Sequence, residues 1–173
     1  MLIDDLYDPE LLARELSVSS DDNNPSAEAI HEIVRRAIRI AVVGISRDPA
    51  KAARRVPSYL AAKGGEIVPV NPNADRILGK EAIDSLRDVE GPIDLVLVFR
   101  PGGEQAGAVI REAMERPERP IIWLQEGIRS DKIAAEARAD GWVVVQDLCI
   151  YKIHRALGDT LRRAEGRGQD PVN

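Results

Sequence analysis

The sequence has few of the residues on which several common kinds of protein site depend. It holds one cysteine, Cys149, two histidines and 3% aromatic residues. A single cysteine excludes a disulfide within the chain and fits the reducing cytoplasm. One Cys and two distant His residues lack the spacing of a metal-ligand cluster, so we expect no metal. So few aromatic rings argue against a stacking surface for single-stranded nucleic acid.

Long hydrophobic runs and an excess of positive charge are also missing. No stretch approaches the roughly 18 apolar residues of a membrane span. The N-terminus lacks the basic and apolar regions of a secretion signal. The net charge of −5 argues against a protein that coats nucleic acid. We therefore expect a cytoplasmic protein without a membrane or nucleic-acid partner, and the sequence does not identify a protein partner.

The length and the apolar content predict one domain with a short extension at each end. The chain has 173 residues, of which 44% are hydrophobic, enough for one core. We expect residues 1–25 to be a peripheral N-terminal extension, with a short helix over 8–16 and a polar linker over 17–25. The domain is expected over residues 26–165, beginning with a helix capped by Ser26. Residues 166–173 are expected to be a disordered tail.

Apolar strand segments alternate with helical segments along the rest of the chain. Strands are predicted at residues 40–45, 66–70, 93–99, 121–125 and 142–145, and helices at 54–62, 104–115, 131–139 and about 150–163. Pro57 is expected in the first turn of its helix, where a proline is tolerated. The alternation predicts an α/β fold with a doubly wound parallel sheet of five or six strands. The expected order is 3-2-1-4-5, and residues 81–83 can add an edge strand.

The first strand ends in Gly44-Ile45-Ser46 and opens into a basic loop. Backbone N–H groups at such a turn attract phosphate, and so does the dipole of the helix that follows. Four cations accompany them, at Arg47, Lys51, Arg54 and Arg55. The alternative is that Gly44 makes a tight turn while the basic residues are solvated, and the residues alone leave both open.

The dinucleotide fingerprint is absent from this turn. The pattern G-x-G-x-x-G requires three glycines, but Ser46 and Pro49 occupy the second and third positions. The second strand ends in Asn71-Pro72, without the acidic residue that holds an NAD ribose. The pattern therefore favours a phosphate ligand other than NAD.

Arg100 follows the third predicted strand, where a guanidinium can bind two phosphate oxygens. Its alternative role is an ion pair with Glu104 or Glu126. We favour the ligand because the position lies at the carboxyl edge of the sheet.

Five spaced motifs together resemble those of small stand-alone coenzyme A-binding proteins. They are Gly44-Ile-Ser46, Pro69-Val-Asn-Pro72, Val98-Phe-Arg-Pro101, Trp123-Leu-Gln-Glu-Gly-Ile128 and Asp147-Leu-Cys-Ile150 with His154. That family is similar to the N-terminal coenzyme A-binding domain of the succinyl-CoA synthetase alpha subunit. The resemblance covers about residues 29–157 and implies a Rossmann-like domain with coenzyme A, or an acyl-CoA, across the strand ends.

The resemblance also implies positions for the parts of the ligand. The loop from Gly44 to Arg47 would hold the diphosphate, and Asn71 and Pro72 would border the adenosine. The segments Phe99-Arg100-Pro101 and Gln125-Glu126-Gly127 would line the rest of the groove.

Cys149 is the one candidate nucleophile. It precedes a predicted helix, with His154 and Asp147 nearby in the sequence, but a lone cysteine is more often a small buried hydrophobe. The sequence leaves enzymatic activity open and favours a protein that carries, senses or regulates without catalysis. Two alternatives are a thiol-dependent enzyme or redox protein that uses Cys149 on CoA thioesters or disulfides, and a ligand-free protein-interaction module.

Overall fold

Five apolar segments form the parallel strands of one sheet. In the computed structural model, which describes residues 8–158, they are β1 (Arg39–Val43), β2 (Glu66–Val70), β5 (Leu95–Val98), β6 (Ile121–Leu124) and β7 (Val144–Val145). The sheet order is β2-β1-β5-β6-β7, and every pair is parallel. These strands are buried because helices cover both faces of the sheet. The predicted α/β Rossmann-like fold is confirmed.

The predicted strand order needs a correction. Counted over the five predicted strands, the order is 2-1-3-4-5, because β5 pairs with β1 rather than extending the sheet beyond β2. The place beyond β2 is taken by Ile83, which forms a single parallel bridge with Val70. If this bridge is counted as a strand, the order becomes 3-2-1-4-5-6. The predicted order therefore matches the structure only when the edge segment around Ile83 is counted as a strand.

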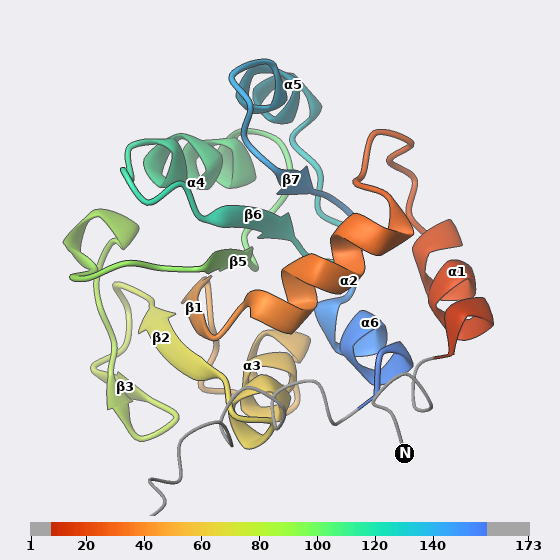
Figure 1. Cartoon of the computed structure of the whole chain (residues 1–173). Coiled ribbons are helices and arrows are strands. Elements are labelled where there is room, and N and C mark those ends of the chain that lie inside the picture. The colour runs from red at the N-terminus through yellow and green to blue at the C-terminus, as the bar shows by residue number, and fades with distance from the viewer. Residues whose placement is uncertain (1–7, 159–173) are drawn as a thin grey trace, which may run out of the picture.

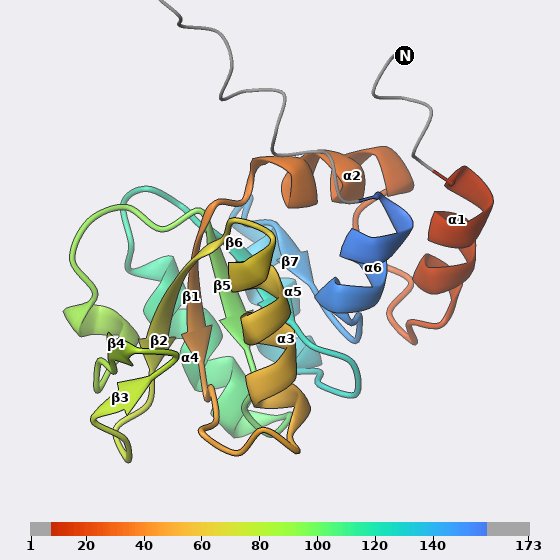
Figure 2. The same cartoon turned by 90° about the horizontal axis from the view of Figure 1, so that it is seen from below.

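Helices cover the two faces of the sheet in separate layers. One layer contains α2 (Ala27–Arg36), α3 (Ala52–Ala62) and α6 (Ile150–Ala156), and the other contains α4 (Glu104–Met114) and α5 (Asp131–Ala139). The helix α1 (Pro9–Ser17) lies outside α6 (Figures 1 and 2). A hairpin of β3 (Arg76–Ile77) and β4 (Lys80–Glu81) and a short 3-10 helix, η2 (Leu86–Asp88), follow β2.

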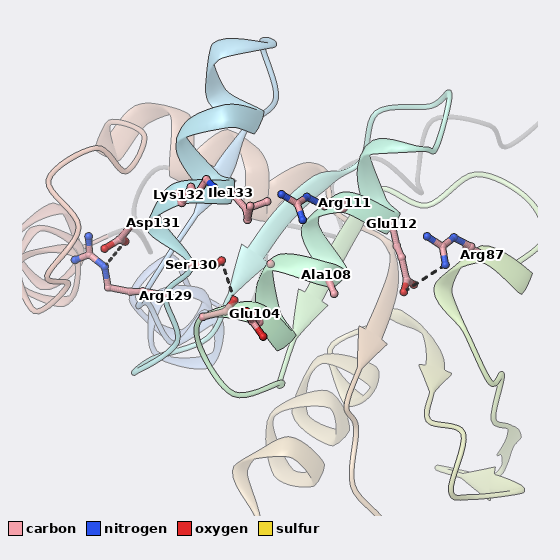
Figure 3. Close-up of a pocket in the computed structure, with 12 residues that line it drawn as sticks. Arg87, Glu104, Ala108, Arg111, Glu112, Arg129, Ser130, Asp131, Lys132 and Ile133 are labelled. Atoms are coloured by element: carbon pink, nitrogen blue, oxygen red, sulfur yellow. Dashed lines mark hydrogen bonds and ion pairs between the residues drawn. The ribbon is translucent and has the colours of Figure 1, made fainter.

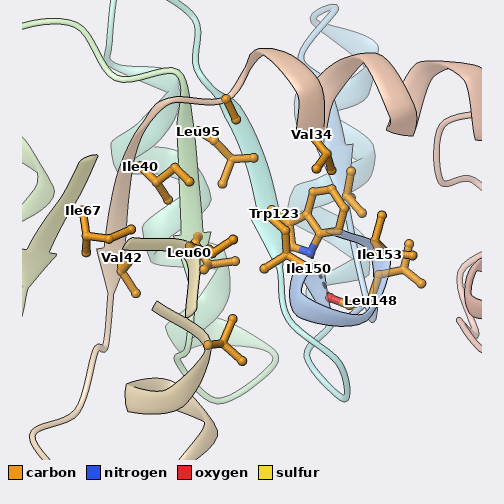
Figure 4. Close-up of a cluster of buried hydrophobic side chains, with 14 of the residues drawn as sticks. Val34, Ile40, Val42, Leu60, Ile67, Leu95, Trp123, Leu148, Ile150 and Ile153 are labelled. Atoms are coloured by element: carbon orange, nitrogen blue, oxygen red, sulfur yellow. Dashed lines mark hydrogen bonds between the residues drawn. The ribbon is translucent and has the colours of Figure 1, made fainter. Parts of the chain in front are cut away.

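The two layers bury two separate hydrophobic clusters. The cluster beneath α2, α3 and α6 includes Ile40, Leu60 and Trp123 (Figure 4). Trp123 is fully buried, and its indole Nε1 donates to the Leu148 carbonyl at 2.8 Å. The cluster beneath α4 and α5 includes Val96 and Ile110. Both clusters hold the strands rigidly, so the carboxyl ends of the strands have fixed positions.

Pro57 lies deeper in its helix than the sequence predicts. The helix α3 begins at Ala52, two residues before the predicted start, so Pro57 is inside the helix rather than in its first turn. The missing N–H of Pro57 leaves the carbonyl of Ala53 without its usual helical donor. The backbone N–H of Ser46 donates to that carbonyl at 3.1 Å. A hydrogen bond from the preceding loop thus replaces the one that proline removes.

The prediction of an unpacked polar linker over residues 17–25 is wrong. Asp21 is 5% exposed, and its carboxylate accepts hydrogen bonds from Arg138 and Gln146 at 3.0 and 2.9 Å. The carboxamide of Asn24 accepts from the Gln146 N–H and donates to the Gln146 carbonyl, both at 2.8 Å. The Asn24 side chain thus pairs with the backbone N–H and carbonyl of Gln146, at the edge of the sheet just beyond β7, as a neighbouring strand would.

Parts of the sequence predictions lie outside the described residues. These are the predicted tail at 166–173 and the domain end at 165. The helix predicted over about 150–163 is wrong in its end, because α6 stops at Ala156 and Gly158, with a φ of +80°, follows the C-cap residue Leu157. The boundary between the extension and the domain at residues 25 and 26 stays a prediction. No helix within residues 8–158 combines the length and the apolar character needed to cross a membrane.

Candidate ligand-binding site

The carboxyl ends of all five strands meet at one edge of the sheet, where the loops that follow them lie together (Figure 2). In open parallel sheets, this is the edge at which ligands bind. Every residue predicted for the site belongs to one of these loops or to the first turns of α3. The topology therefore brings the predicted residues together at one edge of the sheet.

Gly44 packs against the neighbouring strand end. Its φ is +86°, and a Cβ placed on it would lie 2.5 Å from the carbonyl oxygen of Phe99 and 3.4 Å from Cδ of Arg100. The N–H of Gly44 donates to Val70 at 3.0 Å. The glycine is thus required for the close approach of two strand ends, and its N–H already has a protein acceptor.

The basic loop, residues 46–53, is closed by its own hydrogen bonds. Besides the bond from Ser46 to the carbonyl of Ala53, Ser46 Oγ accepts the N–H of Asp48 at 3.0 Å. The carbonyl of Asp48 accepts the N–H of Lys51 at 3.1 Å. Ile45, just before the loop, is fully buried in the core and contributes backbone rather than side chain to this edge. The loop therefore has a defined shape from which its charged side chains project.

Five cations at this edge have no protein partner among the described residues. They are Arg47, Lys51, Arg54, Arg55 and Arg100, none of which forms a side-chain hydrogen bond or ion pair within residues 8–158. Elsewhere, many arginines are paired with carboxylates, including Arg39 with Glu66, Arg87 with Glu115 and Arg138 with Asp21. The alternative role of Arg100 as an ion-pair partner of Glu104 or Glu126 is wrong. Positive charge is therefore left available at this edge.

The Asn71 side chain links the end of β2 to the end of β1 by a hydrogen bond. Its Nδ2 donates to the carbonyl of Ile45 at 2.8 Å, and its Oδ1 accepts the N–H of Asn73 at 2.8 Å. Both polar atoms of the Asn71 side chain therefore already have hydrogen-bond partners within the protein. Pro72, which follows it, is exposed and lines a cavity.

This cavity lies at the ends of β1 and β2 and has a volume of about 350 Å³. Val43 and Val70 supply its apolar wall, and the Arg100 side chain contributes a charge. Sequence reasoning missed its other polar residues, Asp84, Ser85, Gln105 and Glu112. The signal that could have found the first three is their position beside strand ends, after the edge segment and at the start of α4.

Gln125 caps the helix α6. The residue is 4% exposed, its Oε1 accepts the N–H of Ile150 at 2.8 Å, and its Nε2 lies 3.6 Å from Sγ of Cys149. The side chain therefore joins the end of β6 to the start of α6. Cys149 is the half-buried N-cap residue of that helix.

Glu126 and Gly127 are also engaged by the protein. Glu126 forms an ion pair with Lys152 at 3.0 Å, which partly neutralises its charge at this edge. The N–H of Gly127 donates to Asp147 Oδ1 at 2.6 Å. Burial by itself raises the pKa of Asp147, but hydrogen bonds from Ser20 and Gly127 and the charge of Arg129 outweigh it, so the pKa is lowered. Asp147 is therefore a structural anchor between this loop and the N-terminal segment.

The two candidate partners of Cys149 are hydrogen-bonded to other residues. Nδ1 of the buried His154 is hydrogen-bonded to the hydroxyl of Tyr59 at 2.8 Å. Asp147 accepts hydrogen bonds from Ser20 and Gly127. Within residues 8–158, the hydrogen-bond partner of the Cys149 thiol is Nε2 of Gln125.

A wider groove lies between α4 and α5, away from the predicted residues (Figure 3). It measures about 800 Å³, and Arg129, Ser130 and Lys132 are among its lining residues. Arg129 is paired with Asp131 at 2.8 Å, and Ser130 Oγ donates to the Gly103 carbonyl at 2.9 Å. Its size alone therefore does not make it the stronger candidate. In the described part of the chain, no three His, Cys, Asp or Glu residues gather where they could hold a metal ion.

Comparison with known proteins gives an independent view of this edge. A model of the CoA binding domain matches residues 38–155. The uncharacterized protein YneT of Bacillus subtilis is 40% identical over 131 residues, which are 76% of this chain and 96% of YneT. A Thermus thermophilus protein of solved structure is 33% identical, with a TM-score of 0.71, over 77% of this chain and 99% of that one.

A more distant relative is a subunit of a known enzyme. The alpha subunit of the ADP-forming acetate–CoA ligase II of Pyrococcus furiosus is 35% identical over 63 residues. These residues are 36% of this chain and 14% of the subunit. The match to the domain model spans all five strands and every predicted site residue. The chain belongs to the CoA-binding domain family.

Proposed function

We propose that this protein binds coenzyme A or an acyl-CoA at the carboxyl edge of its sheet. The role would be that of a carrier, sensor or regulator rather than a catalyst. The proposal goes beyond family membership because it names the residues of this chain that hold each part of the ligand.

The observation that carries the proposal is the set of five cations that have no side-chain partner within residues 8–158. Arg47, Lys51, Arg54, Arg55 and Arg100 gather at one edge of a protein whose net charge is −5. Coenzyme A presents a diphosphate and a 3′-phosphate, whose oxygens accept charge-assisted hydrogen bonds from such groups. Because these side chains form no ion pair in the described part of the chain, none there has to be broken when the ligand binds.

The cavity at the ends of β1 and β2 supports one orientation of the bound ligand along the edge of the sheet. The adenosine would enter this cavity, where its base lies against Val43 and Val70 and its amino group can donate to Asp84. Arg100 lines the cavity and also stands beside Gly44, so the phosphates would lie between the cavity and the basic loop. The pantetheine arm would then run along the strand ends toward Gln125 and Gly127.

Two features argue against a catalytic role. The Cys149 thiol has neither His154 nor Asp147 as a hydrogen-bond partner, since each is bonded elsewhere. The similarity to the acetate–CoA ligase subunit covers 14% of that subunit. Binding is the part of that protein's chemistry that we carry over.

Titration calorimetry with coenzyme A on the full chain tests the proposal. We expect saturable binding at one site per chain. The triple variant Arg47→Gln, Arg54→Gln, Arg55→Gln should weaken binding. Arg76→Gln is the control for the loss of a cation outside the site, because the exposed Arg76 guanidinium donates to the Gly79 carbonyl within the β3–β4 hairpin. An absence of binding by the natural chain, or equal affinities of the triple variant and the control, would contradict the proposal.

A further inference from the structure

Pro57 affects a backbone hydrogen bond that holds the basic loop. In a regular helix, the N–H of residue 57 would donate to the carbonyl of Ala53, four residues earlier. Proline has no N–H, and its ring pushes that carbonyl away from the helix axis. The carbonyl accepts instead from the N–H of Ser46, at 3.1 Å. Pro57, in the second turn of α3, therefore leaves the Ala53 carbonyl free to accept the hydrogen bond from the loop after β1.

The bond from Ser46 to Ala53 joins the two ends of the basic loop. Inside it, Asp48 N–H donates to Ser46 Oγ at 3.0 Å, and Lys51 N–H donates to the carbonyl of Asp48 at 3.1 Å. Lys51, the N-cap residue of α3, supplies no side-chain hydrogen bond to the helix. The shape of the loop thus depends on hydrogen bonds from its own backbone N–H groups to backbone and side-chain acceptors, and the outermost of them depends on the free carbonyl of Ala53.

We propose that Pro57 is a positioning residue for the basic loop. By leaving the Ala53 carbonyl to Ser46, it fixes the loop from which Arg47 and Lys51 project toward the phosphates of the ligand. The inference rests on the proposed function, because it assigns a ligand role to the shape of that loop. A residue with an N–H at position 57 would compete for the Ala53 carbonyl and loosen the tie to Ser46.

Two variants and one control test this inference. Pro57→Val keeps a similar volume at a buried position and adds the N–H, and Pro57→Ala adds the N–H with a smaller side chain. Val56→Ala is the control, because it removes buried volume from the adjacent residue without changing any backbone donor. Amide hydrogen exchange of Ser46, followed by NMR in the free protein, reports the loop bond. Calorimetry with coenzyme A reports the ligand.

We expect faster exchange of the Ser46 amide in both Pro57 variants, with coenzyme A affinity lower by about threefold to tenfold, the effect of weakening one hydrogen bond. The Val56→Ala protein should keep both properties even if it unfolds at a lower temperature. Unchanged exchange of Ser46 and unchanged affinity in both Pro57 variants would overturn the inference. If the natural chain binds no coenzyme A, the proposed function and the ligand role of the loop both fail, while the exchange of Ser46 still decides whether Pro57 ties the loop.

Discussion

The carbonyl oxygen of Phe99 lies 2.5 Å from the point where a Cβ on Gly44 would stand. The N–H of Phe99 also donates to the carbonyl of Val43 at 2.8 Å, so the ends of β1 and β5 are held together at this point. Real Cβ atoms do not approach a backbone oxygen so closely, and the φ of +86° at Gly44 disfavours any other residue. Gly44 therefore serves first to bring two strand ends together and only through them to shape a ligand site.

Replacing Gly44 with alanine should destabilise the fold. We expect a loss of at least ~2 kcal/mol in the free energy of unfolding, from left-handed strain and a clash with Phe99. Gly79→Ala is the matched control, because Gly79 has a φ of +73° with no atom within 4 Å of the added Cβ. Urea unfolding of the two variants separates the clash from the strain. Equal losses in both would show that the contact with Phe99 does not matter.

Removing the charge of Arg100 should weaken ligand binding without weakening the fold. The side chain has no partner within residues 8–158 and lines the cavity at the ends of β1 and β2. One charge-assisted hydrogen bond contributes roughly 1.5–3 kcal/mol, so Arg100→Gln should reduce coenzyme A affinity about tenfold to a hundredfold. Arg111→Gln, on the exposed side of α4, should leave the affinity unchanged. A reduction of the same size in both variants would point to a nonspecific charge effect.

The N-terminal segment should contribute stability that disappears in acid. Burial by itself raises the pKa of Asp21, but hydrogen bonds from Gln146, Asn23 and Arg138 outweigh it and lower the pKa from 3.8. A carboxyl whose pKa is lower in the folded state stabilises the fold above its unfolded pKa, and this contribution is lost as the pH falls through the folded pKa. Asp21→Asn should therefore lower the free energy of unfolding at neutral pH.

Urea unfolding at neutral pH and again below the unfolded pKa of Asp21, 3.8, checks this expectation. The difference between Asp21→Asn and the natural chain should shrink in acid. The exposed neighbour Asp22 gives the control variant, Asp22→Asn, which should change little at neutral pH. A difference for Asp21→Asn that stays constant across this range would show that its ionised form does not hold the segment in place.

The Cys149 thiol should be dispensable for ligand binding. Its hydrogen-bond partner is Nε2 of Gln125 at 3.6 Å, and His154 is bonded to Tyr59 instead. Cys149→Ala should therefore bind coenzyme A with an affinity within about twofold of the natural chain, which is less than the energy of one hydrogen bond. A larger loss would favour the alternative in which the thiol acts on CoA thioesters or disulfides.

The strands and the edge at which their loops gather were predictable because their signals are local. The apolar runs, such as the one that contains Ile40 and Val42, specify buried parallel strands whatever surrounds them. Parallel strands with crossover helices then place Ser46, Asn71 and Arg100 at one edge. The place of Ile83 in the strand order depends on a single bridge to Val70, which no local pattern indicates.

The partners of polar residues could not be predicted in the same way. Asp21 and Asn24 lie in a stretch with the composition of a linker, yet they bind Arg138 and Gln146 more than 100 residues away. Pro57 lies inside α3, where a hydrogen bond from Ser46 takes up the Ala53 carbonyl, and sequence periodicity does not report such a bond. These contacts arise from tertiary structure, and they separate the residues that hold this edge together from those left for a ligand.

Ligand choice, measured by calorimetry at one fixed ionic strength, tests the central claim most directly. The five cations that have no partner among the described residues offer charge to a 3′-phosphate, and Asn71 and Pro72 offer no carboxylate for an NAD ribose. We expect coenzyme A to bind more tightly than dephospho-coenzyme A, and both more tightly than NAD. Higher salt should reduce the difference in affinity between coenzyme A and dephospho-coenzyme A, because exposed charges are screened. Equal or tighter binding of NAD would contradict the account.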